Sequence, residues 1–233
     1  MIKVDNIDVY GWESSIRGMR SPMNSWDRSD TEIVDVPETP RLDYHGNFVE
    51  MIPAHKMVVT KRIEGKWEGV GENDIDLMKR LFVGGTEHRK YMRWIIVTMD
   101  INAPLYWWKE FDTYRVGVEK NSCSTMHKIH AKEFVMEDFS TEHLEGESIA
   151  CLNKTIWTLN RARNNFLITK DKKYWWQMIQ LLPSSYNQRR TVQINYEVVY
   201  NIIRQRENHK LDEWREFVEM LKNLPYIKEI AND

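Results

Sequence analysis

The segment NAPLYWWKEFDTYRVGVEKNSCSTMH, residues 102–127, decides how we interpret the rest of the chain. It predicts a helix that begins at Pro104, because the missing N–H of a proline would have no partner in a first helical turn. No residue from there to Tyr114 breaks a helix, and Gly117 then offers an exit. The polar residues beyond Gly117 are typical of a loop.

Charged and aromatic side chains of this helix would share one face. Glu110 and Tyr114 are four residues apart, and so are Phe111 and Arg115, which makes each pair neighbours on a helix. That face would therefore present a carboxylate, a phenol and a cation close together. The alternative interpretation is an aromatic-rich core helix whose charges are solvated on one side.

Composition limits the classes of protein to consider. The chain has 233 residues, near the upper size of a single hydrophobic core, and 42% of them are hydrophobic, which excludes wholesale disorder. The 33 Lys and Arg residues nearly balance the 35 Asp and Glu residues, giving a net charge of −2. This balance argues against a general electrostatic interaction with nucleic acid or membrane, while a local basic pocket for a phosphate is compatible with it.

Cysteine usage and the absence of long apolar runs predict a cytoplasmic protein. Cys123 and Cys151 lie far apart, which fits a reducing compartment, and two cysteines are too few for a cysteine-based zinc site, so we expect no metal. The N-terminal sequence MIKVDNIDVYGW lacks the apolar region of a signal peptide. No apolar run approaches about 18 residues, so no membrane span is expected.

Local patterns predict both strands and helices. Strands are expected at residues 2–10, 92–101 and, interrupted at Pro53, 48–62. A helix capped by Asn73 is expected at residues 74–82. Further helices are expected at residues 129–138, 146–168, 172–182, 198–206 and 211–223. The stretch after Tyr10 is interpreted as a loop following one short helical turn, and residues 28–42 as irregular connection.

The expected N-terminal loop carries side chains suited to a ligand. They are Arg17, Arg20, Asn24, Ser25 and Trp26. Guanidinium groups match phosphate oxygens and an indole face can stack on a ring, so this loop is a candidate anion- or ring-binding surface. An ordinary surface loop is the equal alternative.

The 102–127 segment resembles the signature of the flavin-dependent thymidylate synthases (ThyX). Members of that family carry Ala-Pro, a hydrophobic helix with Arg-Gln, then Arg-His-Arg, then Ser-x-Asn-Glu-x-Ser-x-Arg. The same frame here holds Ala103-Pro104, Lys109-Glu110, Thr113-Tyr114-Arg115 and Asn121-Ser122-Cys123-Ser124.

Two further regions extend the resemblance over roughly residues 84–220. Glu87-His88 matches a Glu-His pair that begins a helix near the flavin, and the longer gap from His88 to Ala103 suggests an extra helical turn. Downstream, a Leu-Pro pair is followed by residues on the family's Asn, Asn and Arg positions, with Glu197 replacing an intermediate Arg; these are Asn195, Asn201 and Arg206. Residues 1–83 diverge.

This resemblance implies an α+β fold, a mixed sheet wrapped by helices, as a single domain over residues 1–233. It implies a homotetramer that binds FAD and dUMP and uses methylenetetrahydrofolate and NADPH to methylate the pyrimidine, with hydride supplied by the reduced flavin. The nucleotide would be held by Glu110, Arg115, Ser122, Ser124 and Arg206, of which Ser122, Ser124 and Arg206 occupy catalytic positions. The flavin would be lined by Glu87, His88, Arg115, Asn195 and Asn201.

Arg206 also stands out on physical grounds. On its helix it follows Ile202 by four residues, so it projects from the same stripe as Val199 and Ile202. A guanidinium at the end of an apolar stripe needs a carboxylate, a phosphate or a route to water. A ligand phosphate, an internal ion pair and a side chain that reaches the solvent all satisfy this need.

Departures from the family pattern put the chemistry in question. Thr113 and Tyr114 stand where the family has two cations, and hydrogen bonds to charged groups contribute about 1.5–3 kcal/mol each. Arg17 and Arg20 are the candidate substitutes. Cys123, at or beside a family Ser, could act as a nucleophile if Lys120 or His127 lowered its pKa; an inert residue in a tight loop is the alternative.

Three hypotheses follow. The first is a flavin-dependent thymidylate synthase, or a variant that makes another 5-substituted pyrimidine nucleotide. The second is a ThyX-like nucleotide-binding protein that has lost or changed this chemistry. The third is a purely structural oligomer.

Overall fold

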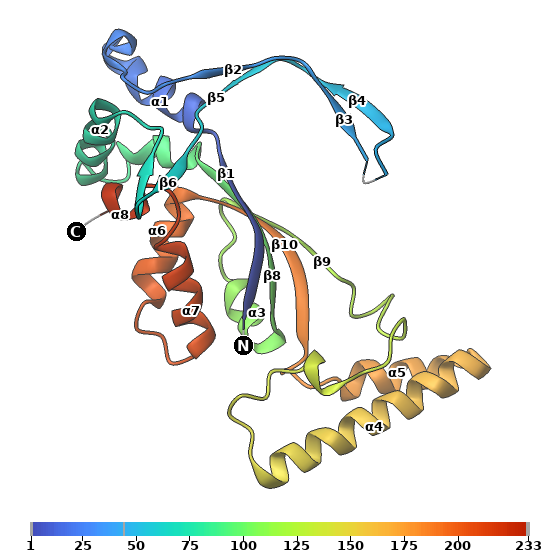
Figure 1. The fold of residues 1–233 in the computed structure, drawn as a ribbon. Coiled ribbons are helices and arrows are strands. Elements are labelled where there is room, and N and C mark those ends of the chain that lie inside the picture. The colour runs from blue at the N-terminus through green and yellow to red at the C-terminus, as the bar shows by residue number, and fades with distance from the viewer. Residues whose placement is uncertain (1, 44, 232–233) are drawn as a thin grey trace. The chain divides into compact units, whose positions relative to one another are not determined.

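The computed structural model describes residues 2–43 and 45–231. Strands from widely separated parts of the chain form a four-stranded sheet (Figure 1). Its strand order is β1-β8-β10-β9, formed by Lys3–Tyr10, Ile96–Pro104, Asn187–Asn195 and Val118–Ser122. Along β8, alternate residues from Val97 to Ala103 are buried, as the sequence pattern predicted. The fold is therefore a mixture of helices and sheet, and the predicted α+β class is confirmed.

Strand β9 corrects the prediction of a loop after Gly117. It pairs antiparallel with β10, and the register places Ser122 opposite Arg190 and Val118 opposite Ile194. Only Val118 of this strand is buried. An edge strand with one buried side chain lacks the alternation that identifies strands from sequence, so its pairing with β10 decides its conformation.

Helices account for most of the remaining regular structure. Their bounds are Trp12–Arg20 for α1, Glu72–Val83 for α2, Leu105–Phe111 for α3, Gly146–Thr169 for α4, Lys172–Leu181 for α5, Tyr196–Arg206 for α6, Asp212–Leu221 for α7 and Ile227–Ile230 for α8. The predicted helices near 74–82, 146–168, 172–182, 198–206 and 211–223 are confirmed with small shifts at their ends. No helix in the part of the chain that the structure describes is long and apolar enough to span a membrane.

Three local predictions were wrong. α1 is a full helix where a loop was expected; it forms because Trp12, Ile16 and Met19 are buried on one face. The predicted helix 129–138 is irregular except for the 3₁₀ turn Met136–Asp138, because the Asn160 side chain takes the backbone N–H (2.9 Å) and C=O (2.8 Å) of Phe134. α3 ends at Phe111, three residues early, so Arg115 is no helical neighbour of Phe111.

Three short antiparallel ribbons occupy most of residues 34–68. β2 (Val34–Val36) pairs with β5 (His55–Met57), β3 (Thr39–Leu42) with β4 (Phe48–Ile52), and β6 (Lys61–Ile63) with β7 (Lys66–Glu68). The β3–β4 ribbon is visible as the hairpin beyond β2 and β5 in Figure 1. These ribbons replace the irregular connection expected over residues 28–42. One or two short strands interrupted at Pro53 were expected over residues 48–62, and β4 and β5 lie on either side of that proline.

The chain forms two compact units, each built from separated segments. The first unit contains the chain up to Asp8, Thr98–Ile194 and Gln205–Val218; the second contains Val9–Val97, Asn195–Arg204 and the chain from Glu219. Because β1, β8, β10, α6 and α7 each pass from one unit to the other, no single cut in the sequence separates the two.

Apolar packing in the first unit has two centres. Helices α4 and α5 lie side by side (Figure 1) and bury Leu152, Leu159 and Met178 against Phe134 and Phe139. The second centre is aromatic and joins α3 to α7, with fully buried side chains from Trp107, Trp108, Phe111, Trp214 and Phe217. The ring centroids of Trp107 and Trp214 lie 4.7 Å apart. This cluster fixes α3, the helix that carries Glu110.

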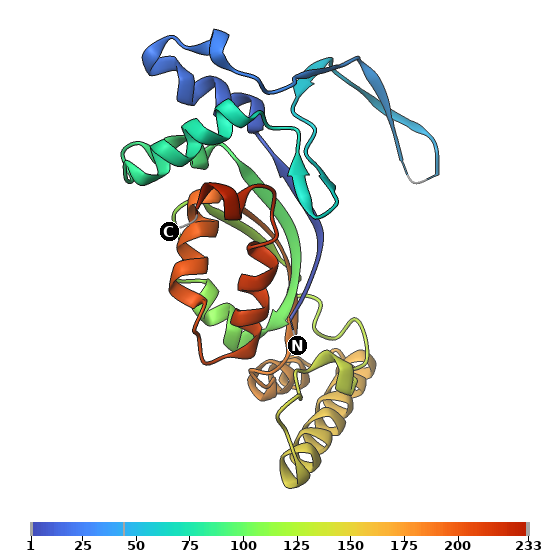
Figure 2. The ribbon, with the colours of Figure 1, turned by 60° about the vertical axis from the view of Figure 1, so that its left-hand side comes forward.

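A buried ion pair joins α1 to α2 in the second unit, where Figure 2 shows the two helices near each other. Arg20 Nε lies 2.6 Å from Asp74 Oδ1, and both side chains are almost fully buried. The hydroxyl groups of Ser29 and Thr31 each donate to Asp74 Oδ2 at 2.6 Å. Three donors thus satisfy one buried carboxylate, as a charge removed from water requires.

The start of α2 differs from the predicted Asn73 cap. The helix begins at Glu72, and the carboxylate of Asp30 accepts the backbone N–H groups of Asn73 (3.0 Å) and Asp74 (3.3 Å). A carboxylate from a distant part of the chain therefore caps this helix, and it complements the positive end of the helix dipole.

Asp100 joins three strands of the sheet within the first unit. It accepts hydrogen bonds from Thr191 (2.5 Å), Arg189 (2.9 Å) and Asn6 (2.8 Å), and Arg189 also reaches Asp5 at 2.7 Å. These bonds, with that of Thr191 foremost, lower the pKa of the Asp100 carboxyl from its ordinary 3.8 to about 2.

We expect Asp74→Asn to lower the free energy of unfolding by about 3–5 kcal/mol, because it leaves the Arg20 charge buried without a counterion. Urea unfolding monitored by tryptophan fluorescence measures this loss. Asp76→Asn is the matched control on the same helix, since Asp76 is exposed and its pair with Lys79 is loose at 3.6 Å. Its effect should stay within about 0.5 kcal/mol, and equal losses in the two variants would contradict a special role for Asp74.

The lowered pKa of Asp100 predicts acid sensitivity. A carboxyl whose pKa is lower in the folded state stabilises the protein above its unfolded pKa, and this contribution disappears as the pH falls through the folded pKa. Wild type should therefore lose stability relative to Asp100→Asn between about pH 4 and about pH 2. Urea unfolding across this pH range measures the difference, and a difference that stays constant would contradict the assignment.

Candidate functional site

Glu110 and Arg206, two residues expected to hold a nucleotide, meet in the first unit. Arg206 ends α6 and its Nη1 lies 2.7 Å from Glu110 Oε2 on α3. Its Nε donates to the hydroxyl of Tyr114 at 3.1 Å, and its guanidinium carbon lies 4.7 Å from the centre of the Trp214 ring. The structure thus brings a carboxylate, a phenol and a cation together, as predicted, but the cation is Arg206 and not Arg115.

His209 completes this cluster and was missed in the sequence. Its Nε2 lies 3.0 Å from Glu110 Oε2, and its Nδ1 accepts the backbone N–H of Leu211 at 3.2 Å. Because Nδ1 is an acceptor, the proton of the neutral ring lies on Nε2 and points to Glu110. The available signal was its position three residues after Arg206, in the turn before α7.

Tyrosine and tryptophan side chains hold α3 against α7 beside this cluster. The hydroxyl of Tyr106 on α3 donates to Glu213 on α7, and burial together with this bond raises the pKa of Tyr106, so the phenol stays protonated. Tyr114 in turn donates to Gln205 Oε1 at 3.0 Å. Glu110, Arg206 and His209 are therefore attached to a packed aromatic core.

The charge balance of the cluster limits what it can bind. Arg206 is about one-fifth exposed and Glu110 about one-third, so both reach the solvent. Their charges cancel, which removes most of the attraction for an approaching phosphate. A phosphate would have to share Arg206 with Glu110 or displace it. Of the alternatives drawn for Arg206 from the sequence, the internal ion pair is the one present here.

The remaining residues expected to bind the nucleotide lie between the end of α3 and the turn that follows β9. Arg115 is exposed beyond the end of α3, and Ser122 is exposed at the last position of β9. Ser124 Oγ accepts the N–H groups of Met126 (3.2 Å) and His127 (2.8 Å), which shapes a turn and leaves its own proton to donate.

A cavity of about 330 Å³ opens beside Ser124. Its lining includes Cys123, Ser124, Lys128, Phe134 and Tyr186. It offers two aromatic rings, the two cations of Lys128 and Lys132 and two small polar groups, which suits a ring bearing polar substituents.

The Cys123 thiol lines this cavity and is exposed and free. One of the groups expected to activate it, Lys120, is paired with Asp112 at 2.8 Å. The positive charge of Lys120 is thus already balanced by a carboxylate, which favours the inert alternative for this cysteine.

Residues expected to line the flavin lie mainly in the second unit. Glu87 and His88 are exposed between α2 and the 3₁₀ turn Arg89–Arg93, which lies in the stretch before Ala103 where an extra helical turn was expected. Asn195 Oδ1 accepts the N–H of Val198 at 3.1 Å and thereby caps α6. Asn201 is half-buried on the same helix.

Arg89 was also missed in the sequence. Its guanidinium carbon lies 5.1 Å from the Phe82 ring centre and 5.2 Å from that of Tyr200, and its buried Nε has no hydrogen-bond partner among the described residues. The sequence offered no signal for it, because the two rings come from different helices. Buried donors normally have a hydrogen-bond partner, so Arg89 Nε is a site at which a ligand could supply an acceptor.

Arg17 and Arg20 occupy different environments. Arg20 is bound to Asp74, whereas Arg17 is exposed and paired with Glu13 at 3.2 Å. Both line a cavity of about 430 Å³ together with Glu13, Ile16, Trp26, Ser29 and Ile33. A cavity therefore lies at the surface for which ring or anion binding was predicted; α1 forms part of its wall, and the segment after α1 supplies Trp26, Ser29 and Ile33.

Comparison with known proteins shows likeness in fold. No family model matches the chain, and no curated protein matches its sequence. Two crystal structures of the thymidylate synthase ThyX from Helicobacter pylori, both containing FAD and dUMP, match 100% of this chain and 98% of theirs. Their TM-scores are 0.66 and 0.59, each at 14% sequence identity. The architecture therefore matches ThyX structures along the whole chain.

We expect Glu110 and Arg206 to be energetically coupled. In a double-mutant cycle with Glu110→Gln and Arg206→Gln, urea unfolding should give a coupling of about 1 kcal/mol, because the pair is partly buried and supported by Tyr114 and Trp214. The matched control is the exposed helical pair Glu13–Arg17, for which about 0.3–0.5 kcal/mol is expected. Equal coupling in both cycles would show that the cluster adds nothing beyond a surface ion pair.

Proposed function

We propose that this protein is a flavin-dependent thymidylate synthase-like enzyme that modifies C5 of dUMP or a related pyrimidine nucleotide. The carrying observation is the match in fold, along the whole chain, to ThyX structures that contain FAD and dUMP. In this proposal FAD is the cofactor, NADPH and methylenetetrahydrofolate are cosubstrates, and the protein works in the cytoplasm as a homotetramer of single-domain chains.

Nucleotide binding is assigned to Glu110, Arg115, Ser122, Ser124 and Arg206. Arg206 would take the phosphate, because the Trp214 ring and the hydroxyl of Tyr114 hold its guanidinium in place. Ser124 retains a proton to donate and borders a cavity with two aromatic rings, which suits the pyrimidine. Glu110 would hold Arg206 in place until the nucleotide arrives.

The residues assigned to the flavin have suitable chemistry. A flavin dinucleotide presents ring nitrogens, carbonyl oxygens and a pyrophosphate, which need N–H donors and cations. His88, Asn201 and Arg115 supply such groups, and the unpartnered Nε of Arg89 belongs to the residue directly after His88. When bound, the reduced flavin would supply hydride; Glu87 and Asn195 would help to orient its ring.

Loss of two family cations is only partly compensated. Thr113 and Tyr114 stand in their places, and of the two candidate substitutes Arg20 is committed to Asp74. Arg17 alone remains available, since its pair with Glu13 is exposed and weak. Affinity for the nucleotide or the flavin should therefore be lower than in a protein that keeps all three residues of the Arg-His-Arg block.

A second candidate function follows from the Glu110–Arg206 ion pair. A site whose fixed cation is neutralised internally can still bind a nucleotide, but it stabilises developing negative charge less well. This observation favours a ThyX-like nucleotide-binding protein that has lost or changed the synthase chemistry.

The test is the visible absorption spectrum of the purified protein with FAD and then with dUMP. We expect a bound-flavin spectrum that shifts when dUMP is added. Arg206→Ala should weaken dUMP binding at least about tenfold, because it removes a charged hydrogen-bond donor. Arg204→Ala, an exposed arginine on the same helix, is the control and should bind like wild type.

The outcomes separate the candidates. Colourless protein that binds dUMP through Arg206 supports the second function and contradicts the first. Protein that binds neither ligand contradicts both. Equal dUMP affinities for Arg206→Ala and Arg204→Ala would contradict the assignment of the phosphate to Arg206.

A further inference from the structure

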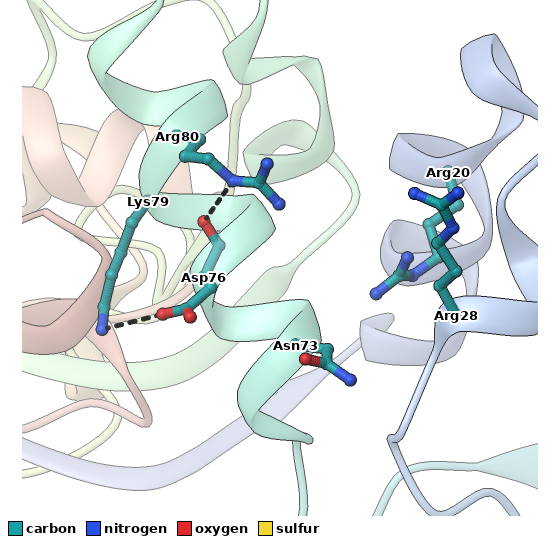
Figure 3. Close-up of a pocket in the computed structure, with 6 residues that line it drawn as sticks. All are labelled: Arg20, Arg28, Asn73, Asp76, Lys79 and Arg80. Carbon is teal, nitrogen blue, oxygen red and sulfur yellow. Dashed lines mark hydrogen bonds and ion pairs between the residues drawn. The ribbon is translucent and has the colours of Figure 1, made fainter.

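A positively charged cavity lies between α2 and the segment after α1, within the second unit (Figure 3). It measures about 640 Å³ and is lined by Arg20, Arg28, Asn73, Asp76, Lys79 and Arg80. Four of these six side chains are cations and one is a carboxylate, although the whole chain has a net charge of −2. The cavity therefore concentrates positive charge that the composition does not require.

Two of the four cations are already paired. Lys79 Nζ lies 3.6 Å from Asp76 Oδ1 on the same helix, and Arg20 is bound to the buried Asp74. Arg28 and Arg80 have no carboxylate partner among the described residues. Arg80 Nε donates only to the carbonyl of Asp76, at 3.4 Å, which leaves its terminal nitrogens free.

These free donors face the same space. In Figure 3 the guanidinium of Arg80 extends from α2 toward the wall that carries Arg28 and Arg20, and Asn73 projects from the first turn of α2 toward the same side. Asp76 and Lys79, which pair with each other, also line this cavity. Two unpaired guanidinium groups on opposite walls are thus available to one ligand.

The walls of this cavity are held firmly. The Arg20–Asp74 ion pair joins them, and Ser29 and Thr31 add two further bonds to the same carboxylate. Asp30 already occupies the N–H groups of Asn73 and Asp74 in the first turn of α2, so these two donors are not available to a ligand. The side chains of Arg28, Arg80 and Asn73 are the donors that we assign to binding.

We propose that this cavity binds a ligand through a diphosphate group. Guanidinium groups bind phosphate oxygens with paired, charge-assisted hydrogen bonds, and two of them on opposite walls match two linked phosphates better than one. Like charges held together without a counterion also raise the energy of the empty site, which binding relieves.

A neighbouring cavity indicates how a nucleotide could supply this diphosphate. The cavity of about 430 Å³ shares Arg20 with the first and contains Trp26, two residues before Arg28. The indole N–H of Trp26 donates to the carbonyl of Arg17 at 3.3 Å, and the side chain is half exposed. A base could stack on this ring while its phosphates reach Arg28 and Arg80, whereas free pyrophosphate would use the first cavity alone.

The proposal stands apart from the proposed function. Arg28, Arg80 and Asn73 belong to none of the positions carried over from ThyX, and they lie in a different unit from Arg206. Failure to bind dUMP at Arg206 would therefore leave this site untouched.

The test is isothermal titration of the full chain with inorganic pyrophosphate in magnesium-free buffer. We expect binding that weakens with added salt. Arg28→Gln and Arg80→Gln should each weaken it at least about tenfold, and Asn73→Ala about threefold. Arg62→Gln, an exposed arginine on β6, is the control and should bind like wild type. All four side chains are exposed, so circular dichroism should show unchanged folding.

A second titration with UDP distinguishes the source of the diphosphate. If Trp26→Leu weakens UDP binding several-fold but leaves pyrophosphate unaffected, the ligand is a nucleotide; if UDP and pyrophosphate bind alike in both proteins, it is free diphosphate. No binding of pyrophosphate or UDP, or unchanged affinity in the doubly substituted Arg28→Gln, Arg80→Gln protein, would overturn the proposal.

Discussion

A single buried carboxylate organises the second unit. A charged Asp74 can be buried only with hydrogen-bond donors, which are Arg20 of α1 and the hydroxyl groups of Ser29 and Thr31 in the segment before β2. This requirement fixes α1 against α2, and it places the backbone so that Asp30 can cap α2. The two cavities that share Arg20 exist because these segments are held at this distance. The buried Asp74 carboxylate thus holds together the segments that line these two cavities.

The Glu110–Arg206 pair is also an attraction between opposite charges, but it lies at the solvent boundary and not in the interior. Both side chains remain partly exposed, so their attraction is weaker and a ligand can compete for the guanidinium. Aromatic packing around Trp107 and Trp214 supplies the rigidity that the ion pair alone lacks. The architecture matches that of ThyX structures with bound FAD and dUMP. Thr113 and Tyr114 stand where the resemblance in sequence would lead one to expect two cations. This protein therefore combines a ThyX-like fold with a charge pattern that differs from the one expected from that resemblance.

Helices and strands with a regular pattern of buried residues were predicted correctly from the sequence. Segments whose conformation depends on hydrogen bonds to a distant part of the chain were not. α4 and β8 carry regular buried stripes, so their position and type follow from the residues alone. β9 is a strand only because β10 provides its hydrogen bonds, and residues 129–138 are kept from forming a helix by the side chain of Asn160. A distant partner supplies the decisive bonds in both cases, and no local pattern records it.

For the candidate site, the sequence by itself identified Glu110, Tyr114 and Arg206 as residues of interest, because a helical spacing and a charge at the end of an apolar stripe can be recognised locally. It also determined the mixture of helices and strands. Only the tertiary structure decided that Glu110 and Arg206 bind each other, that His209 joins them, and that Arg20 is buried while Arg28 and Arg80 are not. The physical reason is that pairing and burial depend on which distant segments meet, and spacing along the chain carries no such information.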